Sequence, residues 1–449
     1  MLNIYQKENL EKSILGKQVI HTDLQYRKLH FCFLRKIDSH VLLWNGMTKQ
    51  LYILTQEEEL ILSSKEISYC EDLDELIEKW CLVPTDFDEA ALYDQAYIAA
   101  NAIHSDDYIN SYVVFTTTVC NARCPYCFEN GCEQKTMSEK TACDVAQYMV
   151  TRAKGKNVTI SWFGGEPLCN TKAIDIISDI LRNNQIQYTS SIVTNGYLMS
   201  EKNINKAANR WNLKSAQITL DGTEEVYNGT KNYICSKEIN PYQIVIHNIE
   251  ALLNAGIRVN IRLNISDGNQ QDLYLLIDQL ADRFHGFGHL NVYCANLYDI
   301  DGADTSEIIQ RKNERFYQMN HYLVQKGLIR HDLNKWSTDQ RGCMAQNPHA
   351  IVITPDAKFG KCEHFSQGEL LTGELYSDDR NNSAVEYWDY STRLPECNTC
   401  ELYPNCIGIT HCPNMMHDCI EAYRPLRYYN LEQGMRAELN KYLRGKNNV

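Results

Sequence analysis

The feature that most constrains the fold is a regular alternation of strand-like and helix-like segments between about residues 112 and 327. Runs rich in β-branched and aromatic residues alternate with runs whose apolar residues recur at helical spacing. The expected strands are residues 112–118, 158–163, 192–196, 217–222, 259–264 and 289–297, and three expected helices are residues 200–211, 243–255 and 270–284. Strands that alternate with helices form parallel sheets with right-handed crossovers, so the sequence predicts an α/β fold of six units.

Three cysteines, Cys120, Cys124 and Cys127, lie in the loop that leaves the first expected strand. In β/α barrels that end of a strand is where active sites are built. Three thiolates can hold three irons of a four-iron, four-sulfur cubane and leave the fourth iron open to a small ligand. The triplet alone also allows a zinc site or unrelated thiols, because a chain with 18 cysteines places some of them close together.

With Tyr126 before its last cysteine, the triplet resembles the signature of the radical SAM superfamily, and by this resemblance Tyr126 is a candidate SAM-binding residue. The resemblance implies a partial (β/α)6 barrel, a [4Fe-4S] cluster on the triplet and S-adenosyl-L-methionine (SAM) as cofactor. Gly164, Gly165, Glu166 and Pro167 end the second strand and resemble the family's motif for the amino group of SAM. Glycines let a backbone approach a ligand, and a carboxylate and carbonyls accept hydrogen bonds from an ammonium. A plain Gly-Gly turn is the alternative.

Polar residues also end the next three strands. By resemblance, Asn195, Asp221, Arg262 and Asn264 meet the ribose and carboxylate of SAM. Arg262 is the candidate for the carboxylate, because a guanidinium can bind one with two hydrogen bonds. Asn195 and Asp221 can equally cap the helices that follow them.

A second group of cysteines follows the barrel. Two of them are separated by two residues and followed by another after five more, a spacing typical of zinc and of iron–sulfur sites. Downstream of a radical SAM barrel, the region resembles the SPASM extension, which carries two auxiliary [4Fe-4S] clusters. The resemblance implies that one cluster is held by Cys397, Cys400, Cys406 and Cys419, and the other by Cys343, Cys362 and Cys412.

This second group departs from the family pattern. Ala357 stands where the family usually has a glycine, and five residues instead of three separate the last two clustered cysteines. Two cubanes bound only by thiolates need eight cysteines, and seven are assigned. One iron is therefore open, or its ligand is His364, His411 or Cys294.

The first 105 residues form a separate expected module. Residues 41–46 and 50–54 predict a hairpin, followed by helices that begin at residue 56 and span residues 72–81. This order resembles the small winged-helix-like α+β module that binds leader peptides, in which the leader adds as a strand. A domain that only covers the barrel is the alternative. The expected domains are thus residues 1–105, 106–330 and 331–449, the last a cysteine-rich SPASM-type domain with a C-terminal helix.

Charge and composition limit which partners and which cellular location the sequence predicts. The net charge of −13 argues against nucleic acid as the main partner. No apolar run approaches the length of a membrane span, and residues 1–10 carry charges where a signal peptide has an apolar core. Together with oxygen-sensitive clusters, these features predict a cytoplasmic enzyme.

The resemblance implies a peptide maturase. Its substrate is a precursor peptide with a leader, its reductant a carrier such as flavodoxin or ferredoxin, and its product an oxidative thioether or carbon–carbon cross-link. No catalytic side chain is identified. One alternative is an anaerobic sulfatase-type formylglycine maturase, and another is a non-catalytic iron–sulfur electron-transfer or zinc-binding protein, although neither kind of carrier needs a SAM site.

Overall fold

The structure of the 449-residue chain is a computed structural model that describes residues 2–3, 17–92, 95, 107–234, 238–297, 305–329, 344–365, 367–388, 395–403 and 424–447. The chain divides into two compact units. Unit 1 comprises Met1–Asp106, His331–Gly342 and Ser391–Val449, and unit 2 comprises Asp107–Arg330 and Cys343–Tyr390. The three-domain division expected from the sequence stays a prediction.

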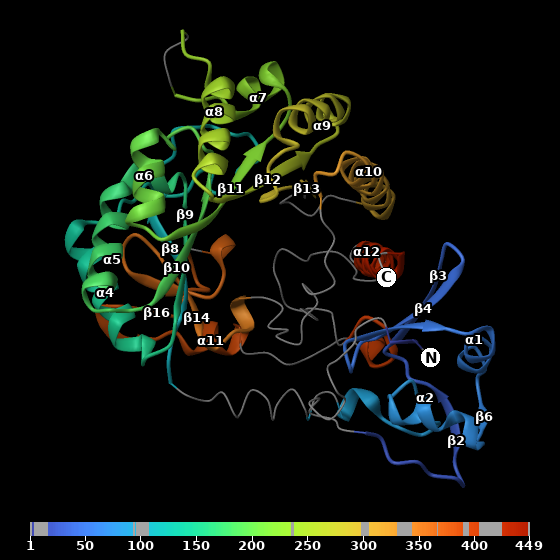
Figure 1. Ribbon diagram of the computed structural model, residues 1–449. Coiled ribbons are helices and arrows are strands. Elements are labelled where there is room, and N and C mark those ends of the chain that lie inside the picture. Colours follow the sequence, from blue (N-terminus) through green and yellow to red (C-terminus); the bar gives the residue numbers. More distant parts are fainter. Residues whose placement is uncertain are drawn as a thin grey trace. The chain divides into compact units, whose positions relative to one another are not determined.

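Six parallel strands form the centre of unit 2 (Figure 1). They are β8 (Ser111–Thr117), β9 (Val158–Gly164), β10 (Tyr188–Thr194), β11 (Leu213–Leu220), β12 (Arg258–Ile265) and β13 (Leu290–Asn296). Each strand pairs in parallel with the next one along the chain. The predicted α/β fold of six strand–helix units is therefore confirmed.

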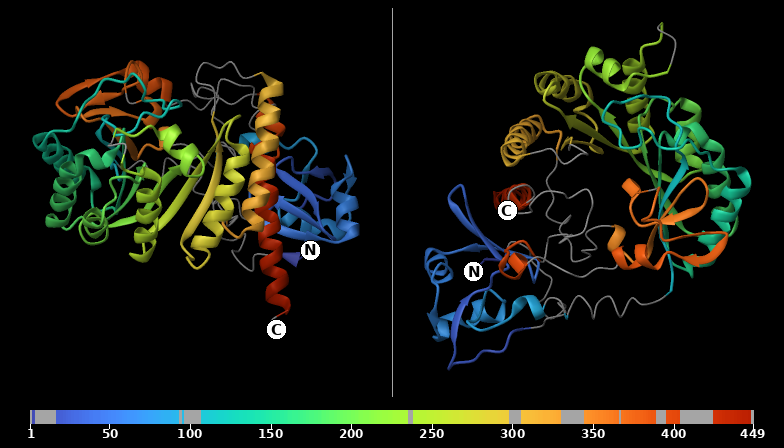
Figure 2. Two further views of the ribbon diagram at one scale, coloured as in Figure 1. Left: turned by 90° about the horizontal axis from the view of Figure 1, so that it is seen from above. Right: turned by 180° about the vertical axis from the view of Figure 1, so that it is seen from behind.

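Helices follow the outer face of this curved sheet (Figures 1 and 2). They are α4 (Glu139–Ala153), α5 (Thr171–Asn183), α6 (Glu201–Asn209), α7 (Glu224–Lys231), α8 (Pro241–Asn254), α9 (Gln270–Phe284) and α10 (Ser306–Gln325). In α5, for example, Ile174, Ile177 and Leu181 recur on one face and are fully buried. This burial against the strands removes apolar surface from water and holds the parallel layer together.

A seventh strand, β14 (Ala350–Ile353), extends the sheet beyond β8 and runs parallel to it. Three antiparallel strands continue the sheet: β15 (Lys358–Gly360), β16 (Gly373–Glu374) and β17 (Ser377–Arg380). A short helix, α11 (Asn382–Trp388), follows them. The sequence analysis did not predict the pairing of β14 with β8. Ala357, in the turn between β14 and β15, has a φ of 62°, which explains why a glycine suits this position.

Among its described residues, unit 1 contains two small antiparallel sheets and several helices. One sheet has the order β1 (Leu2–Asn3), β5 (Gln50–Leu54), β4 (His40–Asn45), β3 (Cys32–Ile37), and the other the order β6 (Ile67–Ser68), β2 (Gln25–Lys28), β7 (Leu82–Pro84). The helices are α1 (Gln56–Leu62), α2 (Asp74–Glu78) and α12 (Arg424–Asn447). The predicted hairpin is present as β4 and β5. The second helix is shorter than expected, because Trp80 adopts a left-handed φ of 59° that ends it.

The carboxyl-terminal part of unit 1 shares a core with the β3–β4–β5 sheet. Leu431 and Met435 of α12, a long straight helix (red in Figure 2), are fully buried with Phe33 and Trp44. Leu402, just after the Cys397–Cys400 pair, lies in the same cluster. Residues 397–403 are therefore packed against the amino-terminal module.

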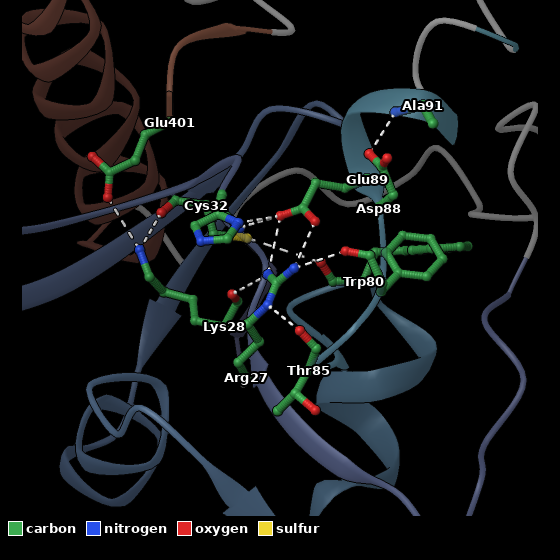
Figure 3. Close-up of polar contacts among 11 residues, drawn as sticks. Arg27, Lys28, Cys32, Trp80, Thr85, Asp88, Glu89, Ala91 and Glu401 are labelled. Carbon is green, nitrogen blue, oxygen red and sulfur yellow. Dashed lines mark hydrogen bonds and ion pairs between the residues drawn. The ribbon is translucent and has the colours of Figure 1, made fainter. Parts of the chain in front are cut away.

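Two ion pairs support this module (Figure 3). Arg27 donates hydrogen bonds of 3.1 and 2.8 Å to the two carboxylate oxygens of Glu89, whose side chain is 3% exposed. Lys28 binds Glu401 at 3.1 Å and the carbonyl of Cys32 at 2.7 Å. The second pair joins the amino-terminal module to the loop that carries Cys400.

No helix within the described residues is long and apolar enough to cross a membrane.

Candidate active site

The cysteine triplet lies on a loop, residues 118–135, that we call the cluster loop. Thr117 at the end of β8 and Thr118 hold its base: the Thr117 hydroxyl donates to the carbonyl of Lys135 at 2.9 Å, and the Thr118 hydroxyl to that of Glu133 at 2.7 Å. The backbone N–H of Thr118 also binds the Lys135 carbonyl at 2.9 Å. The two ends of the loop are thus fixed to each other at the carboxyl edge of the sheet.

The three thiols are half-buried, and none forms a disulfide. Burial raises the pKa of Cys120 to about 12 and also raises that of Cys127, because a low-dielectric environment disfavours thiolates. A bound cation would offset that penalty. Within the described residues, no three His, Cys, Asp or Glu side chains converge on a single metal ion. A cubane binds each thiolate through a different iron, so its ligands need not converge in that way.

Two buried polar atoms beside the triplet further test the fit of a cluster. The Nδ2 of Asn121 and the Oε1 of Glu129 are buried without a hydrogen-bond partner among the described residues. An amide donor of this kind can hydrogen-bond to the sulfurs of a cluster, and such bonds tune its potential. The thiols and the unpaired donor therefore fit an iron–sulfur cluster.

The glycines after β9 are required by a close approach to the base of the cluster loop. Gly164 has a φ of 121°, and a Cβ there would lie 2.0 Å from the carbonyl oxygen of Thr117. A Cβ on Gly165 would lie 2.5 Å from that of Thr118. The N–H of Gly165 binds Thr117 at 3.1 Å, and the N–H of Glu166 binds the carbonyl of Val119 at 2.9 Å. These glycines thus let one loop bind the other, a role the sequence did not reveal.

The Glu166 side chain is completely buried and hydrogen-bonded within the chain. One carboxylate oxygen accepts from the Leu168 N–H at 3.1 Å and the Thr194 hydroxyl at 2.8 Å, and the other accepts from the Asn195 N–H at 2.8 Å. Burial raises its pKa to about 7. Glu166 therefore joins the ends of β9 and β10, and its contact with the amino group of SAM stays a prediction, as do those of Gly164, Gly165 and Pro167.

Asp221, at the end of β11, accepts hydrogen bonds from three side chains. The Tyr126 hydroxyl lies 2.8 and 2.7 Å from its two oxygens, the Asn264 amide donates at 3.1 Å, and the Lys231 ammonium lies 3.1 Å away. The Asn264 side chain in turn accepts from Arg262 Nε at 2.9 Å. The structure thus brings four of the predicted SAM-binding residues into one network.

Neither alternative helix cap is present. The helices after β10 and β11 begin at Glu201 and Glu224, and their N-cap residues are Ser200 and Thr223. Instead, the side-chain oxygen of Asn195 accepts a hydrogen bond from the N–H of Tyr197. The side-chain amide nitrogen of Asn195 donates to the side-chain oxygen of Asn121, on the cluster loop, at 2.7 Å. Asn195 and Asp221 therefore connect the strand ends to the cluster loop.

Five of the predicted auxiliary-cluster ligands and candidate ligands lie outside the described residues: Cys343, Cys406, Cys412, Cys419 and His411. The described ones lie in both units.

Cys362 is buried in unit 2, and the ring of His364, two residues on, lies 4.5 Å from that of Phe128 on the cluster loop. Cys397 and Cys400 lie in unit 1, where the Cys400 N–H binds the Cys397 carbonyl at 3.2 Å. Cys294 is buried in the barrel core on β13. The auxiliary assignments stay predictions.

Lys231 is the main site residue that the sequence analysis missed. Its side chain is 5% exposed and touches both Tyr126 and Asp221. It lies four residues after the buried Tyr227, so the two share a face of α7. A lysine on a buried helical face beside a strand-end aspartate was the available signal.

The fold and site define an α/β partial-barrel protein with a cluster-binding loop at the carboxyl edge of its parallel strands. The sequence profile of the radical SAM superfamily matches residues 114–278. Residues 114–278 thus form a radical SAM domain, a kind of domain that uses SAM and a [4Fe-4S] cluster, and Cys120, Cys124 and Cys127 are the residues that fit the cluster.

Known proteins resemble more than this domain. The chain is 25% identical over 343 residues to the radical SAM cyclopropyl synthase TigE of Paramaledivibacter caminithermalis, an alignment that covers 69% of each chain. It is 23% identical over 285 residues to the GTP 3′,8-cyclase of Clostridium perfringens, over 58% of this chain and 82% of that one. Among solved structures, native anSMEcpe with bound AdoMet and Cp18Cys peptide has a TM-score of 0.55 at 15% identity, covering 76% of this chain and all of that one.

Proposed function

We propose that this protein is a cytoplasmic radical SAM maturase that forms an oxidative cross-link, a thioether or a carbon–carbon bond, in a ribosomally made peptide. The observation that carries the proposal is the arrangement at the carboxyl edge of the sheet, where the cluster loop contacts the ends of β9, β10 and β11. The fold shared with anSMEcpe, which was solved with a bound peptide, supports a peptide substrate.

The chain's own residues would hold two kinds of group. Cys120, Cys124 and Cys127 would bind three irons of one cluster, and Arg262 would bind the carboxylate of SAM through its guanidinium group. When bound, these cofactors and two auxiliary clusters supply a 5′-deoxyadenosyl radical and a route for the second electron. The carbonyls of residues 164–167 would accept from the ammonium of SAM, because the Glu166 carboxylate already has three donors.

The leader is proposed to add to the open edge of β3. Among the described strands, the sheet ends at β3, which pairs only with β4. Ile37 and His40 close a two-residue turn, so they form a hydrogen-bonded pair, and the alternation of such pairs directs the Lys36 N–H away from β4. That N–H is available to an added strand.

A backbone test of this edge uses one position. Lys36→Pro removes the outward N–H without removing a β3–β4 bond, and Lys36→Ala keeps the N–H while removing the same charge. Binding of a leader peptide should fall in the proline variant only. Equal binding by the wild type and both variants would contradict strand addition at β3. These point variants are preferable to deleting residues 1–105, which would expose the buried face of α12.

The function itself is tested with the reconstituted full chain and two probes. One is a short precursor peptide that carries a leader, and the other is a cysteine-containing sulfatase-type peptide. A maturase should remove two hydrogen atoms from the first peptide and produce 5′-deoxyadenosine, as mass spectrometry would detect. Modification of the sulfatase-type peptide alone would favour the formylglycine maturase. No 5′-deoxyadenosine with either peptide would favour a non-catalytic protein.

A further inference from the structure

The strongest unassigned feature is a buried ion pair beneath the cluster loop. Lys231, the last residue of α7, and Asp221, directly after β11, lie 3.1 Å apart with side chains that are 5% and 2% exposed. Removing two charges from water is costly, so a pair this deeply buried needs further hydrogen bonds. The Tyr126 hydroxyl, which belongs to the cluster loop, supplies them.

Lys231, Asp221 and Tyr126 form a triad in which each hydrogen-bond donor has an acceptor. The Tyr126 hydroxyl has one proton, which it donates to the Asp221 carboxylate, and its oxygen accepts from the Lys231 ammonium at 3.0 Å. The ammonium also lies 5.6 and 5.9 Å from the ring centroids of Tyr126 and Tyr227, within cation–π range. The Tyr126 side chain thus has a single orientation that satisfies all three groups.

The end of α7 also binds the cluster loop through the backbone. The N–H of Arg123 donates to the Lys231 carbonyl at 2.9 Å, and the N–H of Ile234 donates to the Asn121 carbonyl at 2.8 Å. These backbone contacts meet the loop before Cys124, and the side-chain contact of Lys231 with Tyr126 meets it after Cys124. Lys231 takes part with its main chain and its side chain alike.

The network continues from the triad to the predicted SAM site. Asp221 accepts from Asn264, and Asn264 accepts from Arg262. Loss of the Lys231 ammonium leaves a buried carboxylate without its cation, so the Asp221 side chain must reorganise toward other hydrogen-bond partners. That rearrangement disturbs Tyr126 on one side and Asn264 on the other.

We propose that Lys231 is a positioning residue that, through Asp221 and Tyr126, holds the cluster loop in the geometry that receives SAM. Lys231 touches neither the cysteine ligands nor Arg262 by hydrogen bond, and it acts through Tyr126 and Asp221. The inference requires the radical SAM domain but not the peptide substrate proposed above, so the two can fail separately.

The test compares four variants of the full chain. Lys231→Met removes the cation, and Lys231→Arg restores a cation in the same place. Tyr126→Phe removes only the hydroxyl and leaves the ion pair intact, which covers the case that Lys231→Met does not fold. The matched control is Lys206→Met, because Lys206 pairs with the buried Asp175 at 2.8 Å on the same domain, away from the cluster loop.

Three readouts are made, and none of them requires turnover. Amide hydrogen exchange of residues 120–128 in the metal-free chain reports the order of the loop, and the dissociation constant of SAM and the electron paramagnetic resonance signal of the reduced cluster report the site. Lys231→Met should raise exchange and the dissociation constant by at least roughly tenfold, with Tyr126→Phe intermediate. Lys231→Arg should recover most of both, and Lys206→Met should change neither.

The proposal is overturned if Lys231→Met leaves loop exchange and SAM affinity unchanged. It is also overturned if Lys206→Met causes the same losses, since the effect would then be general destabilisation. If Lys231→Met does not fold, unchanged exchange and affinity in Tyr126→Phe would overturn it.

Discussion

Three glycine-to-alanine changes separate backbone strain from steric clash at the base of the cluster loop. Gly164 has a φ of 121°, and a Cβ there would clash with its neighbours. A Cβ on Gly165 would also clash, but the φ of Gly165 is not positive. Gly131 has a φ of 85°, and a Cβ there would have no heavy atom within 4 Å. Gly164→Ala therefore combines both penalties, while Gly165→Ala has only the clash and Gly131→Ala only the strain.

The structure sets the size of each effect. A left-handed alanine costs about 1–2 kcal/mol. Overpacking that moves a backbone carbonyl costs about 1–3 kcal/mol more. Gly164→Ala should thus destabilise unit 2 by about 2–5 kcal/mol, Gly165→Ala by about 1–3 kcal/mol and Gly131→Ala by about 1–2 kcal/mol. The clash at Gly164 also displaces the Thr117 carbonyl, from which the cluster loop begins.

The assay pairs denaturant unfolding of the metal-free chain with iron bound per chain after reconstitution. Gly164→Ala and Gly165→Ala should lose iron from the triplet, and Gly131→Ala should retain it although it lies on the cluster loop itself. If Gly131→Ala loses as much iron as Gly164→Ala, the close approach of the two loops is not what positions the cysteines.

Three further predictions concern other parts of the chain. Hydrogen bonds from Arg27 and His30 outweigh the effect of burial and lower the pKa of Glu89 to about 2, so its stabilisation is present above pH 4.5 and is lost as the pH falls toward 2. Glu89→Gln should therefore destabilise unit 1 by up to about 3 kcal/mol at pH 7 and by little near pH 2, as acid unfolding of both proteins would test. Lys28→Met should cost less than about 1 kcal/mol, because the Lys28–Glu401 pair is partly exposed, and a double-mutant cycle with Glu401→Gln in urea measures the coupling. Ala357→Gly should change stability by less than about 1 kcal/mol, since relief of the left-handed φ offsets the buried methyl group lost, and equilibrium unfolding measures the difference.

The sequence predicted the barrel well because its signals are local. Each strand and helix of the six units carries its own periodicity, and parallel pairing follows from the alternation. The pairing of β14 with β8 joins residues more than two hundred positions apart, and no local pattern specifies it. The short α2 likewise depends on the left-handed Trp80, which propensity does not reveal.

At the site, the sequence indicated which strand-end residues lie near one another, but not which hydrogen bonds they form. Tyr126, Asp221, Arg262 and Asn264 do form one network, as their positions at neighbouring strand ends suggest. The internal hydrogen bonds of Glu166 could not be foreseen, because a strand-end carboxylate has the same appearance in sequence whether it binds a ligand or the chain.

The central claim is tested most directly by anaerobic reconstitution with iron and sulfide, followed by dithionite and SAM, with 5′-deoxyadenosine and iron per chain measured together. The account predicts 5′-deoxyadenosine from a chain with about twelve irons, and a triple variant of Cys120, Cys124 and Cys127 that keeps about eight irons and forms none. Iron near four per chain with 5′-deoxyadenosine formed would remove the auxiliary clusters and keep the barrel chemistry. Fully loaded protein that forms no 5′-deoxyadenosine would contradict the account.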